Sequence, residues 1–176
     1  PFFLSNSFNY ECDLKGLYQD QNINTCVSAL KLLKNFKFSK EDISSGLENV
    51  KETTGITGRW QVFEKPILTI CDIAHNVEAL KIVFSQIGEL QKKTHVIIGF
   101  SSDKDIERIV KILPSEFKYY ICSSSNSRII NPKQITYMFK EKKLNYLTFD
   151  SVFSAYKTIM QKSPKNNISL VTVSYT

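Results

Sequence analysis

The sequence contains no run of about 18 apolar residues, so we expect no transmembrane helix and no membrane partner. Its first residues carry no basic segment followed by an apolar one, which argues against a secretory signal. There are only two histidines, and none of the four cysteines stands in a C-x-x-C pair. These absences argue against a zinc site in this chain and favour a reduced, cytoplasmic setting.

Two phosphate-binding motifs are also missing. There is neither a G-x-x-x-x-G-K-[ST] phosphate loop nor a G-x-G-x-x-G after the first predicted strand, which argues against ordinary dinucleotide binding. An Arg-rich stripe and an aromatic RNA-binding motif are lacking, so nucleic acid is not an expected partner. The net charge is +6. Dispersed, solvated lysines are the simpler explanation of that charge, and attraction to phosphorylated ligands is the alternative.

From residue 60 onward, apolar runs of strand length alternate with amphipathic segments of helix length. This rhythm predicts β-α-β units and a mostly parallel sheet, and the apolar strands indicate that helices cover both faces. The expected fold class is therefore α/β, a Rossmann-like sheet flanked by helices, with its first two strands forming a hairpin. The predicted strands span residues 60–64, 67–73, 95–100, 117–122, 146–149 and 168–174, and the predicted helices span 77–92, 103–113, 131–143 and 152–162.

The first part of the chain does not follow this rhythm and predicts a small α-rich segment. Its first helix is expected to turn Ile23, Val27, Leu30 and either Leu32 or Leu33 inward, and Ser39 is expected to cap the second helix. The predicted elements are an edge strand at 8–14 and helices at 21–33 and 40–50.

Residues 52–58 have the composition of a linker. We therefore divide the chain into two predicted domains, residues 1–55 and residues 56–176. The sequence lacks an initiator Met and begins in mid-pattern, so we expect it to be cut from a longer polypeptide.

Polar residues gather where the predicted sheet begins. Arg59 follows a glycine, Asp72 ends the second strand, and His75 and Asn76 open the next helix. In open α/β sheets, ligands bind at the carboxyl ends of the strands. There Arg59 can reach a phosphate from a hinge, Asp72 can accept hydrogen bonds from ribose hydroxyls, and His75 can face an anion. The alternatives are a surface arginine, a loop-ordering aspartate and a structural histidine, with Asn76 as a helix cap.

Weaker candidates lie elsewhere. Asn22 follows a glycine turn and can read an adenine edge, although on local grounds a helix N-cap is the preferred interpretation. Lys104 follows another strand and can hold a carboxylate, or it belongs to an exposed capping turn. The loop at 123–128 can receive an anion or serve only as a turn, and Ser174 ends the last strand.

Together these motifs resemble the Mur ligase family, most closely its folate branch, the dihydrofolate/folylpolyglutamate synthases. The resemblance covers essentially the whole chain, with Ile73 and Val77 as departures from the usual residues. The segments that carry it are 13–22, similar to G-x-x-Q-x-x-N; Gly58-Arg59-Trp60-Gln61, similar to the G-R linker; Asp72 to Asn76, similar to D-x-A-H-N; Gly99 with Asp103-Lys104-Asp105, similar to G-x-x-x-D-K-D; and 125–128, similar to an S-x-x-R loop.

The resemblance implies that residues 1–55 end a central ATP-binding domain and that residues 56–176 form the C-terminal glutamate ligase domain. It implies ATP-dependent transfer of L-glutamate onto dihydropteroate or folates through an acyl phosphate, with ATP and Mg²⁺ as cofactors. The metal ligands and the phosphate loop would lie in the missing N-terminal part of the same polypeptide. The isolated chain would then be inactive, and a cytoplasmic monomer is expected.

The resemblance also implies roles for individual residues. Asn22, Arg59 and Asp72 would bind ATP. His75, Lys104 and Ser174 would bind the amino acid. The catalytic set would be Arg59, Asp72 and His75, acting through orientation and charge stabilisation, not as nucleophiles.

Three alternatives stay open. The chain can belong to a Mur-type ligase with another acceptor, of the peptidoglycan or cyanophycin type. It can be a stand-alone nucleotide-binding or regulatory module, which would have to bind ATP without a phosphate loop. It can also be a structural α/β domain whose polar strand ends only cap helices. On that last interpretation, replacing Asp72 by Ala costs only about 1 kcal/mol of stability.

Overall fold

The computed structural model describes residues 10–124 and 128–173, and the chain divides into two compact units, residues 1–57 and 58–176. Within the described ranges, no helix is long and apolar enough to cross a membrane. Assignment of the first unit to a central ATP-binding domain stays a prediction.

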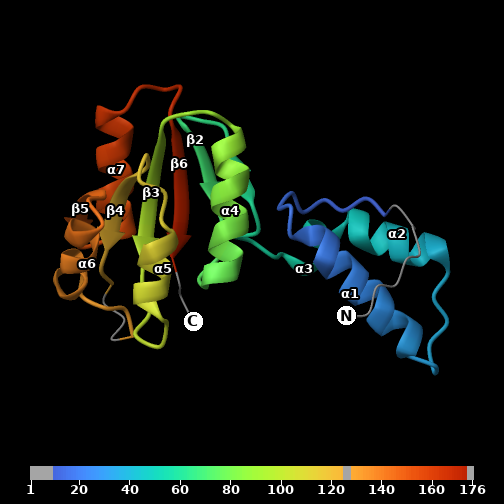
Figure 1. The fold of residues 1–176 in the computed structure, drawn as a ribbon. Helices are drawn as coiled ribbons and strands as arrows, with labels where there is room; N and C mark the ends of the chain where they lie inside the picture. Colours follow the sequence, from blue (N-terminus) through green and yellow to red (C-terminus); the bar gives the residue numbers. More distant parts are fainter. Residues whose placement is uncertain (1–9, 125–127, 174–176) are drawn as a thin grey trace. The chain divides into compact units, whose positions relative to one another are not determined.

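The second unit is built on one six-stranded sheet with the strand order β1-β2-β6-β3-β4-β5 (Figure 1). The last five strands of this order run parallel, and β1 joins the edge as the antiparallel partner of β2. The predicted α/β sheet and its opening hairpin are therefore confirmed. The strands are β1 (Gln61–Phe63), β2 (Leu68–Cys71), β3 (Thr94–Gly99), β4 (Lys118–Cys122), β5 (Asn145–Phe149) and β6 (Ile168–Val173).

Helices cover both faces of this sheet, and every residue of the central strand β3 is buried. On one face, Ile159 of α7 packs in a cluster with Ile97 and Tyr120. Because side chains alternate along a strand, Tyr119 points to the other face, where its ring meets Phe139 of α6 at 5.8 Å between centroids. The helical elements are α4 (Val77–Glu89), α5 (Ile106–Ile112), the 3₁₀ turn η1 (Pro132–Gln134), α6 (Thr136–Glu141) and α7 (Val152–Lys162).

Three predicted helices of this unit are shorter than expected. Helix α4 ends at Glu89 instead of residue 92. Helix α5 begins at Ile106 because Asp105 caps it, accepting a hydrogen bond from the Arg108 backbone N–H at 3.1 Å. The predicted helix 131–143 is wrong as a single element, because it consists of η1 followed by α6. It ends before Lys143, whose φ of 57° is left-handed and cannot continue a right-handed helix.

The described part of the first unit, residues 10–57, contains three helices, α1 (Gln19–Leu32), α2 (Lys40–Glu48) and α3 (Val50–Thr54). Ser39 caps α2 as predicted. The Asp42 N–H donates to the Ser39 hydroxyl at 3.0 Å, and the Ser39 N–H donates to the Asp42 carboxylate at 2.8 Å. Such a capping box satisfies amides that a helix N-terminus leaves without partners. Helix α3 occupies residues expected to belong to the linker.

Two further expectations for this unit are wrong. Residues 10–14 form no strand, because Asp13 bonds to helices instead. Its carboxylate accepts from the Lys51 N–H at 2.9 Å, and its N–H donates to the Leu47 carbonyl at 3.3 Å. The end of α1 also turns outward, with Leu32 77% and Leu33 47% exposed. Among the described residues expected to point inward from this helix, Val27 is buried as predicted, whereas Leu32 and Leu33 are not.

Candidate functional site at the carboxyl ends of the strands

Asp72 follows β2 at the carboxyl edge of the sheet and is only 2% exposed. Its carboxylate accepts backbone hydrogen bonds from the N–H groups of Trp60 and Ala74, each at 2.9 Å. A buried carboxylate is unfavourable without such donors. Asp72 thus joins the turn before β1 to the turn after β2, which is the loop-ordering role that the sequence left open. Its role toward ATP stays a prediction.

Arg59 lies in the turn that Asp72 holds. Gly58 has a φ of 70°, and a Cβ at this position would lie 2.8 Å from the Ile73 side chain, so glycine fits where larger residues do not. The Gly58 carbonyl also accepts a hydrogen bond from the Ile73 N–H at 2.9 Å. Arg59 itself is half-buried, and its guanidinium makes no hydrogen bond or ion pair with any described residue. The backbone of the Arg59 turn is therefore held in place, while the Arg59 guanidinium has no partner among the described residues.

His75 and Asn76 connect this turn to α4. The Asn76 side chain accepts from the Ala79 N–H at 2.8 Å, so its predicted role as a cap is confirmed. His75 Nδ1 lies 3.0 Å from the Ile73 carbonyl. A carbonyl only accepts, so Nδ1 is the donor, and a neutral ring then offers Nε2 as an acceptor.

His75 and Lys104 line the same small cavity at this edge, although they come from loops after different strands. Parallel strands bring their carboxyl ends to one edge, which explains why residues nearly thirty positions apart meet here. The two residues predicted to orient an amino acid are therefore placed together. The polar and small residues beside them are Ala74, Gly99, Ser101 and Thr172.

The loop after β3 fixes the Lys104 ammonium. Its nitrogen lies 2.9 Å from Asp103, whose carboxylate also accepts from the Ser101 hydroxyl. Hydrogen bonds from Lys104 and Ser101 lower the pKa of Asp103 to about 2. The carboxylate is thus charged at neutral pH and holds Lys104 at the cavity.

Two residues that the sequence did not single out shape this edge. The Thr172 hydroxyl, near the end of β6, donates to the Ala74 carbonyl at 2.6 Å. Ser101 is 2% exposed and bonds Asp103. The sequence did show a hydroxyl residue, Thr172, near the end of an apolar strand. Sequence spacing does not show which group such a hydroxyl contacts.

Asn22 belongs to the first unit and not to this edge. It lies within α1, whose N-cap is Tyr18, so the preferred interpretation of Asn22 as a cap is wrong. Its amide nitrogen donates to the Gln19 side chain at 2.8 Å, one turn earlier. Contact with adenine stays a prediction.

The remaining predicted positions lie in loops at the ends of β4 and β6. Ser174 and residues 125–127 lie outside the described residues. Arg128 is described, and its carbonyl accepts from the Ser102 N–H at 2.8 Å. The loop after β4 is thereby tied to the loop that carries Lys104.

The described part of this edge offers cations and an imidazole, with no metal centre. Across the described ranges, no three His, Cys, Asp or Glu side chains lie close enough to hold a metal ion. Arg59 and Lys104 can neutralise phosphate or carboxylate charge, and His75 can accept or donate a hydrogen bond. An α/β sheet with such groups at its carboxyl edge belongs to the class of domains in which ligands bind at the strand ends.

Comparison with known protein families identifies the family to which this domain belongs. Residues 58–174 match the family model for the Mur ligase glutamate ligase domain, so the chain belongs to the Mur ligase family. The match covers the whole sheet with its helices.

Relatives and solved structures agree with this membership. The chain is 30% identical over 139 residues to a dihydrofolate synthase/folylpolyglutamate synthase of Buchnera aphidicola, covering 72% of this chain and 32% of that protein. It is 34% identical over 120 residues to a probable dihydrofolate synthetase of Schizosaccharomyces pombe, covering 64% and 27%. A bifunctional folylpolyglutamate synthase/dihydrofolate synthase of Yersinia pestis, complexed with AMPPNP and Mn, superposes with a TM-score of 0.67 at 25% identity, covering 85% and 35%. The chain thus spans about a third of the length of the proteins it matches.

Proposed function

We propose that this chain is the C-terminal part of an ATP-dependent ligase that adds L-glutamate to dihydropteroate or folates. The observation that carries the proposal is the gathering of His75 and Lys104 in one cavity, beside the turn of Arg59 and Asp72, in a Mur ligase glutamate ligase domain. The functions of the Buchnera and Schizosaccharomyces relatives supply the folate acceptor. A ligase of the same family with another acceptor is the alternative outcome.

The chemistry assigned to this chain is positioning and charge neutralisation. The acceptor carboxylate is activated as an acyl phosphate at the expense of ATP, and the glutamate amine displaces phosphate to form the amide. Arg59 would contact the nucleotide phosphates, with Asp72 fixing its turn and facing the ribose. His75, Lys104 and Ser174 would hold glutamate, and Asn22 would meet adenine. Preorganised cations of this kind stabilise developing charge in a transition state.

Magnesium would accompany ATP. It would neutralise charge on the transferring phosphoryl group. No three-ligand group exists among the described residues, so the ligands are assigned to the part of the parent protein that precedes this chain. The same part would carry the phosphate loop, which this sequence lacks.

The proposed division is residues 1–55 as the end of the central domain and 56–176 as the ligase domain. Exposed apolar residues at the end of α1 and in the segment after it support this division, because Leu32, Phe36 and Phe38 are 77%, 63% and 42% exposed. Several large exposed apolar side chains on a small unit mark a surface that another protein segment covers. We assign the missing N-terminal part of the same polypeptide to it, in a cytoplasmic monomer.

The test is ADP release by the full-length parent protein with glutamate and either dihydropteroate or a reduced folate. We expect ADP formation with at least one pair, and an Arg59→Gln variant should lose turnover by about 10²–10³-fold, as for other transition-state donors. Arg108→Gln is the matched control, because Arg108 is exposed and pairs only loosely with Asp105 at 4.0 Å.

The outcomes separate the candidate functions. Turnover with another acceptor and amino acid would keep the family and remove the folate assignment. No turnover with any acceptor, or an Arg59→Gln variant as active as Arg108→Gln, would contradict the role proposed for this edge.

A further inference from the structure

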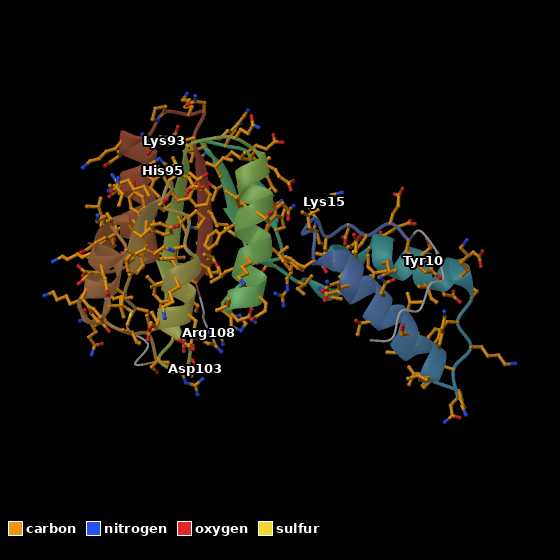
Figure 2. All side chains as sticks on the ribbon, in the orientation of Figure 1. Tyr10, Lys15, Lys93, His95, Asp103 and Arg108 are labelled. Carbon is orange, nitrogen blue, oxygen red and sulfur yellow. The ribbon has the colours of Figure 1, made fainter. Side chains whose placement is uncertain are left out.

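A band of polar residues crosses the opposite, amino end of the sheet. Strand register places Ser169 beside His95, His95 beside Lys118, and Lys118 beside Asn145. Partners in register share a face, and alternation puts them on the face covered by α7, where Tyr120 also points. Figure 2 shows Lys93 and His95 at this end and Asp103 and Arg108 at the other.

His95 organises this band and is only 4% exposed. Its Nδ1 lies 3.0 Å from the Tyr120 hydroxyl, and its Nε2 lies 3.0 Å from the Asn167 amide nitrogen and 3.1 Å from the Ser163 hydroxyl. Burial, helped by Lys118 and Lys93, lowers the pKa of His95 to about 4. The ring is therefore neutral at neutral pH.

The neutral ring fixes the direction of the hydrogen bonds. The Asn167 amide nitrogen only donates, so Nε2 accepts and Nδ1 carries the proton. Nδ1 then donates to the Tyr120 oxygen, which leaves the hydroxyl hydrogen of Tyr120 for another acceptor. The described residues provide none, and Tyr120 lines an open groove of about 350 Å³.

The groove is also rich in positive charge, and the Lys118 ammonium lies 5.7 Å from the centroid of the Tyr120 ring. Lys93, Lys118 and Lys162 line it, against the single carboxylate of Glu116. Among the described residues, none of the three ammonium groups forms an ion pair. The volume lies within the roughly 300–1,000 Å³ of small-molecule sites.

We propose that this groove binds a small phosphate-bearing anion, held by Lys93, Lys118 and Lys162 and by the hydroxyl hydrogen of Tyr120. Phosphate is favoured over a single carboxylate because its higher negative charge and larger number of acceptor oxygens match three ammonium groups and a hydroxyl donor. Lysine ammonium groups bind phosphate as point charges. The site goes beyond the proposed ligase function, because it lies at the other end of the sheet from Arg59 and Lys104.

The test is a titration of the full chain with inorganic phosphate, followed by residue-resolved amide NMR near neutral pH and at constant ionic strength. We expect saturable shifts at Thr94, His95, Lys118 and Asn167. Lys118→Gln should weaken phosphate binding at these amides by about tenfold, the usual effect of losing a hydrogen bond from a charged group. Lys157→Gln is the matched control, because Lys157 is an exposed lysine of α7 that does not line the groove.

Tyr120→Phe, which keeps the ring and removes the donor, should also weaken binding. Succinate at equal ionic strength separates a phosphate site from a general anion site, and it should shift the groove amides far less. Three outcomes would overturn the proposal: amide shifts no larger than those with sodium chloride, equal shifts with succinate, or unchanged phosphate binding in Lys118→Gln. Shifts at Ala74 to Asn76 report phosphate binding at the carboxyl edge. Binding at the groove and binding at the carboxyl edge are therefore measured separately.

Discussion

At the scale of single residues, Asp72 combines a structural position with a proposed functional one. A capping aspartate on a surface turn accepts one exposed hydrogen bond, whereas Asp72 accepts two buried ones that join turns twelve residues apart. Loss of turnover in an Asp72 variant therefore does not by itself show a role in catalysis. Arg59, with no bond to the described residues, is the sharper probe of the reaction.

Replacement of Asp72 by Ala should destabilise the second unit by about 2–5 kcal/mol, because two buried amides lose their acceptor. Asp105→Ala is the comparison, since Asp105 caps α5 in an exposed position and should cost only about 1 kcal/mol. Urea unfolding monitored by circular dichroism measures both. Equal losses in the two variants would contradict a loop-ordering role for Asp72.

His95 predicts a pH dependence of stability. Its pKa is lowered to about 4 in the folded protein against 6.5 for the free side chain. Between these values the unfolded chain binds the proton and the folded protein does not. His95 therefore lowers the free energy of unfolding as pH falls from 6.5 toward 4, with a slope approaching about 1.4 kcal/mol per pH unit.

Unfolding measured across this range should show a shallower pH slope in His95→Gln than in the unchanged protein. The slope is the readout, because the substitution also removes hydrogen bonds and lowers stability at every pH. An unaltered slope in His95→Gln would show that another group causes the acid sensitivity.

At the scale of elements, the carbonyls at the end of α5 accept hydrogen bonds from a lysine that follows the end of α6. The Lys142 ammonium follows the end of α6 and donates to the carbonyls of Val110 at 3.0 Å and Leu113 at 2.8 Å, and also to that of Lys111. The last carbonyls of a helix have no partner within it, and a cation there also complements the helix dipole. Burial lowers the pKa of Lys142, as expected for an ammonium drawn into the protein.

Lys142→Met keeps the apolar stem and removes the ammonium, so it should destabilise the second unit by about 1.5–3 kcal/mol. Lys140→Met, in the exposed part of α6, should change stability by less than about 0.5 kcal/mol. Thermal or urea unfolding of both variants provides the measurement. A Lys142 variant as stable as the Lys140 variant would show that the carbonyls are satisfied equally well by water.

Sequence pattern predicted these elements best where local chemistry dominates. Helix α7 begins and ends as predicted because Ser151 caps it and its apolar spacing is regular. The predicted helix at 131–143 divides, because Asn131 accepts from the Lys133 N–H and starts a 3₁₀ turn instead. The strand predicted at 8–14 is wrong over its described residues, 10–14, because Asp13 bonds to helices, a long-range contact that no local pattern encodes.

At the scale of the whole molecule, the two units differ in how completely they bury apolar residues. The sheet of the second unit has a continuous core between its helix layers, with Ile97 and Tyr119 fully buried. In the first unit, Phe36 and Phe38 stack on one another at 6.0 Å between ring centroids while remaining exposed. The second unit therefore has a hydrophobic core of its own, and that core supports its α/β architecture.

The alternation of strands and helices, the capping by Ser39 and Asn76, and the placing of Arg59, Asp72, His75 and Lys104 beside strand ends could all be predicted from the sequence. Each depends on local spacing or on a motif, which the chain order carries directly. Three features could be learned only from the folded chain: Asp72 accepts a hydrogen bond from the Trp60 amide, Thr172 donates one to the Ala74 carbonyl, and His95 lines a groove together with lysines. These facts depend on which strands become neighbours, and the order β1-β2-β6-β3-β4-β5 is set by the packing of the whole sheet.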